Sequence, residues 1–211
     1  MTLELRALTL TPHGGTPLFS ALNLSVPPGV IYTVMGPSGV GKSTLLDAIG
    51  GHLAPEFRLQ GEIFLDGLNV GNLPAEARRI GLMFQEALLF PHLSVGENLA
   101  FGLTPALRGR SARRQAIEAA LDRTGLSGFF DRDPATLSGG QRARAALMRT
   151  LLARPRALLL DEPFSRLDAG LRSEIRHFAF EHARAEGLPT LLVTHDESDA
   201  QAAGGPVHLL A

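Results

Sequence analysis

The sequence predicts an α/β fold with a parallel sheet at its core, and three features carry this prediction. An apolar, β-branched run at residues 30–35 ends in a glycine-rich turn, and a helical stretch follows at about 41–49. Two further apolar runs, at residues 157–160 and 190–194, are separated by a helical segment. Because strand, helix and strand in this order form the repeating unit of parallel sheets, these segments are expected to share one sheet.

The remaining segments predict antiparallel strands and a block of helices. Residues 3–26 alternate apolar residues with turn signals, which is typical of short antiparallel strands. Residues 61–69 and 79–84 have the pattern of further strands, and a last strand is expected at about 207–210. Between them, residues 86–154 are helical in character, with apolar positions three and four apart.

Length and composition fit one domain with a hydrophobic core. The chain has 211 residues, of which 45% are hydrophobic and 19% charged, and its formal net charge is −1. We expect a single domain over 1–211, with the sheet core at about 1–85 and 156–211 and an inserted helical subdomain at about 86–155. The near-neutral charge argues against a nucleic-acid partner, because nucleic-acid-binding domains are usually strongly basic.

Residue types and run lengths exclude several classes of protein. The chain has no cysteine, which excludes a disulfide framework and a thiolate metal site. No apolar run approaches the roughly 20 residues that span a bilayer. The N-terminus also lacks the basic start and long apolar middle of a signal peptide. If the protein acts at a membrane, we therefore expect it to act through a partner.

Residues 36–44 fit the phosphate-binding pattern G-x-x-x-x-G-K-[ST]. Glycines let the backbone N–H groups of such a loop point at one centre, and the following helix directs its positive end there. Lys42, the one lysine in the chain, can then reach the β- and γ-phosphates, and the Ser43 hydroxyl can bind Mg²⁺. A chance match is the alternative. The nucleotide-binding candidates are Gly36, Pro37, Ser38, Gly39, Val40, Gly41, Lys42, Ser43 and Thr44.

Two acids follow the apolar run at residues 157–160. A buried strand places Asp161 at its carboxyl end, where ligands bind in open α/β sheets. We expect Asp161 to hold Mg²⁺, directly or through water, and Glu162 to polarise a water that attacks the γ-phosphate. The alternative is a strand end that is solvated by two acids.

A second candidate anion site opens the arginine-rich helix near residue 140. Ser138 can cap this helix, and the two glycines after it leave the first N–H groups bare. A capped helix after a glycine-rich loop is the alternative. The residues of this signature are Leu137, Ser138, Gly139, Gly140 and Gln141.

With these motifs in this order, the sequence resembles the ABC ATPase family of P-loop NTPases over nearly all of its length. The resemblance implies a RecA-like core, ATP and Mg²⁺ as cofactors, and an ATP-dependent homodimer in which one protomer's signature completes the partner's site. It implies that Gln85 contacts Mg²⁺ or the attacking water, that His195 contacts the γ-phosphate, and that Asp168 couples the two sites. Each has an alternative when taken singly. Gln85 could be a solvated loop residue, His195 a satisfied histidine at a strand end, and Asp168 a helix cap.

Residues 85–99 resemble the importer type of this family, in which they line a groove for a short cytoplasmic helix of the permease. Leu88, Leu89, Phe90 and Leu93 suit such docking, although packing within the helical subdomain is the alternative. The chain is similar in detail to the short ATP-binding subunits of thiamine-type and YnjD-type importers. This implies a permease and a periplasmic binding protein as partners, and a peripheral location on the cytoplasmic face of the inner membrane. An exporter or lipoprotein-extraction ATPase, or a non-transport ABC ATPase, is the alternative.

Three departures from the family pattern affect these expectations. His13 occupies the position where many relatives stack an aromatic ring on adenine, so base selectivity is expected to be relaxed unless His13 has no ligand role. Arg166 stands at a position that is usually small or polar. The chain ends at Ala211, and we expect no regulation through a C-terminal domain.

Four arginines, at positions 108, 110, 113 and 114, cluster in the helical segment. Such a cluster could bind nucleic acid or lipid headgroups. No aromatic platform accompanies it, and we interpret it as the solvated face of the helical subdomain.

Overall fold

The computed structural model describes residues 1–104, 106–165, 167 and 169–210. The chain divides into two compact units. The first comprises Met1–Leu82, Arg156–Glu162 and His177–Ala211, and the second comprises Met83–Pro155 and Pro163–Arg176. The second unit thus takes in residues 163–176 besides the expected helical insertion.

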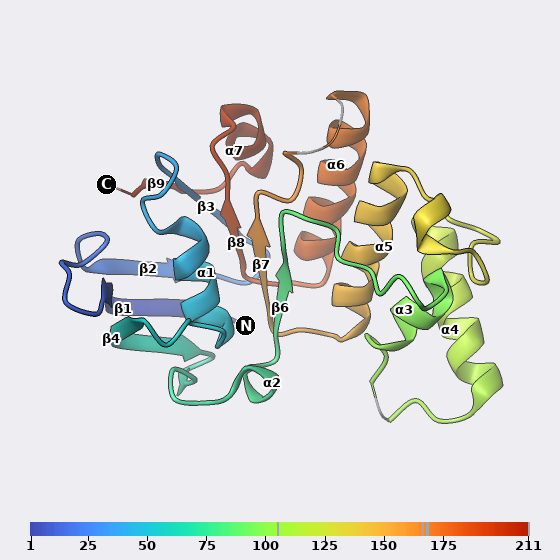
Figure 1. The fold of residues 1–211 in the computed structure, drawn as a ribbon, viewed down its shortest axis with the longest axis horizontal. Coiled ribbons are helices and arrows are strands. Elements are labelled where there is room, and N and C mark those ends of the chain that lie inside the picture. The colour runs from blue at the N-terminus through green and yellow to red at the C-terminus, as the bar shows by residue number, and fades with distance from the viewer. Residues whose placement is uncertain (105, 166, 168, 211) are drawn as a thin grey trace. The chain divides into compact units, whose positions relative to one another are not determined.

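A five-stranded sheet forms the centre of the first unit, in the order β6–β7–β8–β3–β9 (Figure 1). β8 runs parallel to both β7 and β3, and β3 runs parallel to β9. β8 is buried at every position and β7 at all but its last, as expected for parallel strands that are covered on both faces. The predicted α/β class with a parallel core is therefore confirmed. The strands are β3 (Ile31–Met35), β6 (Ile80–Met83), β7 (Ala157–Asp161), β8 (Thr190–Val193) and β9 (Val207–Leu209).

A four-stranded sheet in the order β2–β1–β4–β5 confirms the predicted antiparallel strands. The strand expected at 61–69 is two strands, because Asp66 and Gly67 have positive φ angles of 52° and 75° and turn the chain. Asp-Gly favours such a two-residue hairpin turn. The strands are β1 (Leu3–Pro12), β2 (Leu22–Val26), β4 (Phe57–Leu65) and β5 (Leu68–Asn69).

Helix α1 (Lys42–Gly50) packs against both sheets of the first unit. Leu45 and Ile49 of this helix are fully buried in one cluster with Leu5 of β1, Leu159 of β7 and Leu191 of β8. Both sheets thus hold the position of α1. The unit also contains α2 (Ala75–Arg78), the second half of α6 (Ala169–Ala185) and α7 (Glu197–Ala203), a short helix beside β3 that the sequence pattern did not predict.

Helices make up the second unit, as the pattern of residues 86–154 predicts. α3 (Val95–Ala100) packs against α4 (Arg110–Arg123) and α5 (Gly139–Leu152), and a short 3-10 helix, η1 (Pro134–Thr136), precedes α5. Gly96 of α3 allows the segment after α4 to pack closely, because a Cβ atom there would lie 2.5 Å from the Phe130 ring. Within the described parts of the chain, no helix has both the length and the apolar character needed to cross a membrane.

Candidate functional site

The predicted phosphate-binding loop connects β3 to α1 and depends on its glycines. Gly39 and Gly41 have φ angles of 83° and 103°, which side chains other than glycine rarely adopt. A Cβ atom on Gly36 would lie 2.6 Å from the Leu210 carbonyl oxygen. Gly41 is the N-cap of α1 and has no side chain with which to cap it. The first N–H groups of α1 are therefore open to an anion from outside the helix.

Lys42 is held against this loop. Its side chain is buried, and its Nζ atom donates to the carbonyl oxygens of Gly36 at 2.8 Å and Pro37 at 2.9 Å. The ammonium thus lies beside the loop backbone, where it can neutralise phosphate oxygens.

Asp161 lies at the end of β7 and accepts a hydrogen bond from the Ser43 hydroxyl. Burial raises the pKa of Asp161 above its ordinary value of 3.8, and the charges of Glu162 and Asp47 raise it further, whereas Ser43 and Lys42 lower it. The carboxyl groups of Asp161, Glu162 and Asp47 thus lie near a single ammonium, that of Lys42. A divalent cation would offset the excess negative charge.

The donor set fits a magnesium–nucleotide complex. No group of three or more His, Asp or Glu side chains that could hold a metal occurs among the described residues. Mg²⁺ is usually held by one or two protein oxygens together with substrate phosphates and water, which is what a serine hydroxyl and an aspartate offer. Ser43 and Asp161 are therefore suited to Mg²⁺ that arrives with a nucleotide.

Glu162 and His195 are in direct contact. The Nδ1 atom of His195 lies 3.0 Å from Oε1 of Glu162, and the imidazole is 61% exposed. Strand register explains the contact, since Asp161 of β7 is paired with Val193 of β8, and Glu162 N donates to the Val193 carbonyl at 2.9 Å. Glu162 has a φ angle of 43°, a left-handed conformation of the kind that costs about 1–3 kcal/mol and often marks functional sites.

His13 lies in an exposed turn after β1, and its N–H donates to the Glu56 carbonyl at 2.8 Å. The loop then returns toward α1, because a Cβ atom on Gly41 would lie 2.8 Å from Leu18 and 3.4 Å from Phe19. The loop that carries His13 thus approaches the start of α1. Stacking of His13 on a base stays a prediction.

Ser138 caps α5, as the sequence predicts. Its Oγ atom accepts from the Gln141 N–H at 3.3 Å, and its own N–H donates to the Gln141 side chain at 2.9 Å. Gly140 is required by packing, because a Cβ atom there would overlap Leu171 of α6. A Cβ atom on Gly139 would meet nothing within 4 Å among the described residues, so the fold of this unit does not require that glycine. Leu137 is buried, and the role of the signature at a nucleotide stays a prediction.

Gln85 lies in the second unit and lines a cavity of about 420 Å³. Its Nε2 atom donates to the Ser165 hydroxyl at 3.3 Å. Leu88, Gly139 and Arg142 line the same cavity. Gln85 thus lines the same cavity as Leu88, which lies at one end of the segment that the sequence predicts to receive a permease helix.

Two residues that sequence reasoning missed hold the backbone of this segment. Asn98 is fully buried, and its Nδ2 atom donates to the carbonyls of Phe90 and Leu93, both at 3.1 Å, while Oδ1 accepts from Phe90 N at 2.7 Å. Arg149 of α5 donates to the Leu88 carbonyl at 2.7 Å, and its guanidinium lies 5.4 Å from the centre of the Phe90 ring. Their acceptors are backbone atoms, which leave no motif in the sequence.

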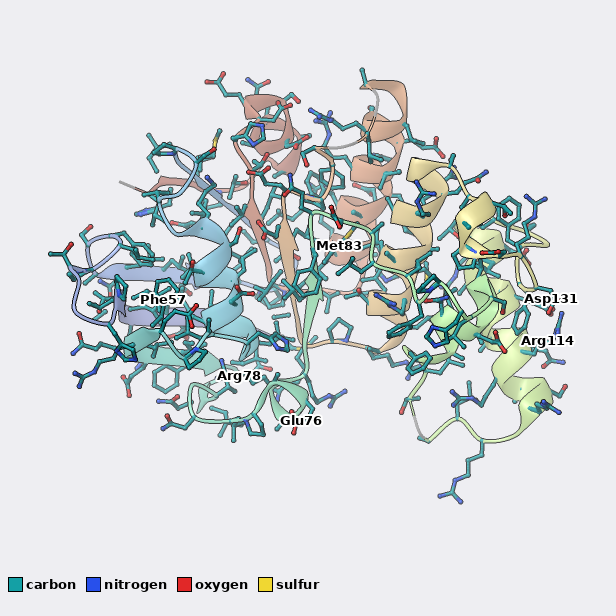
Figure 2. The ribbon with its side chains drawn as sticks, viewed as in Figure 1. Phe57, Glu76, Arg78, Met83, Arg114 and Asp131 are labelled. Atoms are coloured by element: carbon teal, nitrogen blue, oxygen red, sulfur yellow. The ribbon has the colours of Figure 1, made fainter. Side chains whose placement is uncertain are left out.

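The arginine cluster of the second unit makes internal contacts. Arg114 donates to Glu118 at 2.8 Å and to Asp131 at 2.9 Å, and Figure 2 shows Arg114 and Asp131 together beside α4. Arg113 donates to the Ala100 carbonyl at 2.9 Å. Two of the four arginines of the cluster are thus held by bonds within this unit, and the interpretation of the cluster as a solvated face stays a prediction. Two predicted positions, Arg166 and Asp168, lie outside the described residues.

Together, the glycine loop before α1, the buried lysine, the two acids at the end of β7 and the histidine after β8 define a nucleoside-triphosphate hydrolase of the P-loop class. The comparisons with known proteins specify the family. A protein-family model described as "ABC transporter" matches residues 19–165. The chain therefore belongs to the ABC transporter family.

Relatives of known sequence place the chain among the ATP-binding subunits. It is 52% identical to the uncharacterized ABC transporter ATP-binding protein YnjD of Escherichia coli K12, over 88% of this chain and 85% of the relative. It is 48% identical to the thiamine import ATP-binding protein ThiQ of Cereibacter sphaeroides, over 82% of this chain and 74% of the relative. The predicted resemblance to the importer-type ATP-binding subunits is confirmed.

Other relatives are longer than this chain. Identity to the Fe(3+) ions import ATP-binding protein FbpC of Escherichia coli O157:H7 is 40% over 97% of the chain, which spans only 58% of that relative. Among solved structures, a dimeric, post-hydrolysis state of the ATP-binding cassette MJ0796 bound to ADP and phosphate superposes with a TM-score of 0.83. It is 29% identical and is matched over 99% of this chain and 94% of that one. The predicted ATPase activity of the family is thereby confirmed.

The raised pKa of Asp161 predicts a stability change with a defined sign. The folded protein binds more protons than the unfolded chain between pH 3.8 and the raised pKa, so this group destabilises the fold as pH rises through that window. Without metal and nucleotide, Asp161→Asn should unfold a few degrees higher than the parent at about pH 7.5, with the difference narrowing toward pH 4.

Thermal unfolding in a chelator at a series of pH values measures this difference. Asp131→Asn, a change to an exposed carboxylate, is the matched control and should bring no gain. A lower unfolding temperature for Asp161→Asn than for the parent at about pH 7.5 would contradict the assignment.

Proposed function

We propose that this chain is the ATP-hydrolysing subunit of a binding-protein-dependent importer and acts at the cytoplasmic face of the inner membrane. One observation carries the hydrolytic part of the proposal. Glu162 and His195, at the ends of β7 and β8, are 3.0 Å apart, and β8 pairs with β3, the strand that leads into the phosphate-binding loop. A carboxylate can accept the proton of an attacking water, an imidazole can contact the terminal phosphate, and a helix end of this kind can bind it.

The first task of the site is to bind the triphosphate. Open N–H groups at the start of α1 and the ammonium of Lys42 supply positive charge for the β- and γ-phosphates. To reach these phosphates, Lys42 exchanges its contacts with the Gly36 and Pro37 carbonyls for phosphate oxygens. Ser43 and Asp161 would hold Mg²⁺, which would neutralise charge on the phosphates when it is bound.

The second task is to activate water. Glu162 orients a water molecule toward the γ-phosphorus and accepts its proton as the new P–O bond forms and the bond to the β-phosphate breaks. His195 holds the Glu162 carboxylate through Nδ1, and its exposed ring is available to the γ-phosphate. Gln85, from the second unit, is proposed to complete the water site.

A second copy of the chain is proposed to cover the nucleotide with its signature helix. Gly139 supports this role, since no contact among the described residues explains a glycine there. A side chain at this position would instead separate the N–H groups of α5 from an approaching phosphate. Asp168 is proposed to lie in the same interface.

The permease is proposed to dock on residues 88–93. Leu88 and Phe90 are 53% and 41% exposed, although they belong to a segment whose backbone is fixed by Asn98 and Arg149. Exposed apolar side chains on a fixed backbone suit a groove for an amphipathic helix, because little conformational freedom is lost on binding. The solute would be recognised by the permease and by its periplasmic binding protein.

The proposed base role predicts a separation of binding from turnover. Glu162→Gln removes the proton acceptor but keeps the shape of the side chain, so the variant should bind ATP normally and hydrolyse it at least about 100-fold more slowly. Steady-state phosphate release and equilibrium binding of ATP measure the two properties. The control Glu56→Gln changes an exposed carboxylate and should turn over like the parent. Parental turnover in Glu162→Gln would rule out the base assignment.

The docking proposal predicts that the same substitution at two exposed leucines has different effects on capture of the permease. Leu88→Glu places a charge in the proposed groove and should abolish capture of the permease, whereas Leu68→Glu, at a residue that is 55% exposed on β5, should not. The measurement is mass spectrometry of what co-purifies with each tagged variant, in a Glu162→Gln background with ATP, from gently solubilised membranes. Equal capture of the same permease by both variants would contradict the docking site.

A further inference from the structure

Arg78, the last residue of α2, is buried at the far end of α1 from the phosphate-binding loop. Its Nη1 atom donates to the carbonyl oxygens of Ala48 at 2.7 Å and Ile49 at 2.8 Å, both in the last turn of α1. Its Nε and Nη2 atoms donate to the carbonyls of Leu73 at 2.8 Å and Gly71 at 2.7 Å. Figure 2 shows Arg78 between α1 and the segment that carries α2.

These four bonds explain how a guanidinium is tolerated in the protein interior. Burial lowers the pKa of Arg78, which shows that desolvation opposes its charge. The last carbonyls of a helix have no partner within the helix and carry the negative end of its dipole. Arg78 therefore satisfies the carbonyls of Ala48 and Ile49 and neutralises the end of α1 at the same time.

The position of Arg78 connects α1 to the strand that follows α2. β6 begins at Ile80, two residues after Arg78, and leads along the chain to Gln85. The packing around the guanidinium leaves little room, since a Cβ atom on Gly51 would lie 2.9 Å from Nε of Arg78. α1 has only nine residues, and we expect Lys42 at its other end to follow a shift at its C-terminal end.

We propose that Arg78 is a positioning residue for nucleotide binding, which fixes α1 against the start of β6 and so sets where the phosphate-binding loop lies. The inference rests on the proposed function in one respect, namely that the N-terminal end of α1 binds the phosphates of ATP. Arg78 does not touch the nucleotide itself. Its contribution is the placement of Lys42 and of the N–H groups of α1, which contact phosphate in the ground state as well as in the transition state.

This placement predicts an effect on affinity rather than on the amount of active protein. Loss of an interaction that acts equally on the bound substrate and the transition state weakens binding, whereas irreversible unfolding removes binding sites. Reversible unfolding weakens binding only in proportion to the unfolded fraction, so each variant is titrated at a temperature at which thermal unfolding shows it to be folded. Arg78→Met, which keeps the apolar stem, should raise the dissociation constant for nucleotide about tenfold with an unchanged number of sites. Arg78→Lys keeps the charge but loses the planar fork, so its dissociation constant should fall between those of the parent and Arg78→Met.

Calorimetric titration with adenylyl imidodiphosphate and Mg²⁺ reports the dissociation constant and the number of sites in one experiment. Arg58→Met, at an exposed arginine of β4, is the matched control and should bind like the parent. A raised dissociation constant with full stoichiometry supports the proposal. A parental dissociation constant with fewer sites means that Arg78 serves only the stability of the fold, and it overturns the proposal.

Two further results keep this test decisive. If Arg78→Met does not fold, as judged by thermal unfolding, the comparison rests on Arg78→Lys, and a parental dissociation constant in the folded lysine variant overturns the proposal. Absence of binding by the parent chain would instead contradict the proposed function, so that failure is distinguishable from failure of the role of Arg78.

Discussion

The register of three neighbouring parallel strands is the constraint on which the rest of this molecule depends. Val34 of β3 is paired with Val193 of β8, which is paired in turn with Asp161 of β7. Because ligands bind where such strands end, this register brings the phosphate-binding loop, the two acids and His195 to one edge of the sheet from segments far apart in the sequence. A slip of one residue in either pairing would turn the side chains of that strand to the opposite face.

The same edge of the sheet contains several features that each lower the stability of the fold. Glu162 adopts a left-handed backbone conformation, the pKa of Asp161 is raised mainly by burial, and Lys42 is buried with its ammonium on two carbonyls. These features are tolerated because the surrounding strands and α1 share one cluster of buried apolar residues. Local conflict within an otherwise consistent fold is expected at functional sites, and here it coincides with the residues proposed for catalysis.

The sequence predicted what depends on local pattern and on motifs. Buried parallel strands, the glycine loop before α1 and the Ser138 cap could all be inferred from neighbouring residues. The pattern of residues 61–69 predicted one strand, and the structure has β4 and β5 with the Asp66–Gly67 turn between them. α7 was not predicted because it is too short for helical periodicity to be evident. Arg78, Asn98 and Arg149 could not be predicted, because their acceptors are backbone carbonyls, up to 61 residues away in the case of Arg149. Such contacts are set by the fold and leave no pattern in side-chain types.

A structure of the Glu162→Gln variant with ATP and Mg²⁺ tests the central claim, that the strand ends and α1 together form the site of hydrolysis. The account predicts the triphosphate on the N–H groups of residues 39–44, with Lys42 moved from the Gly36 and Pro37 carbonyls onto phosphate. It further predicts Ser43 and Asp161 at the metal and His195 beside the γ-phosphate. A triphosphate bound away from residues 36–44, or one that leaves Lys42 on those carbonyls, would contradict it.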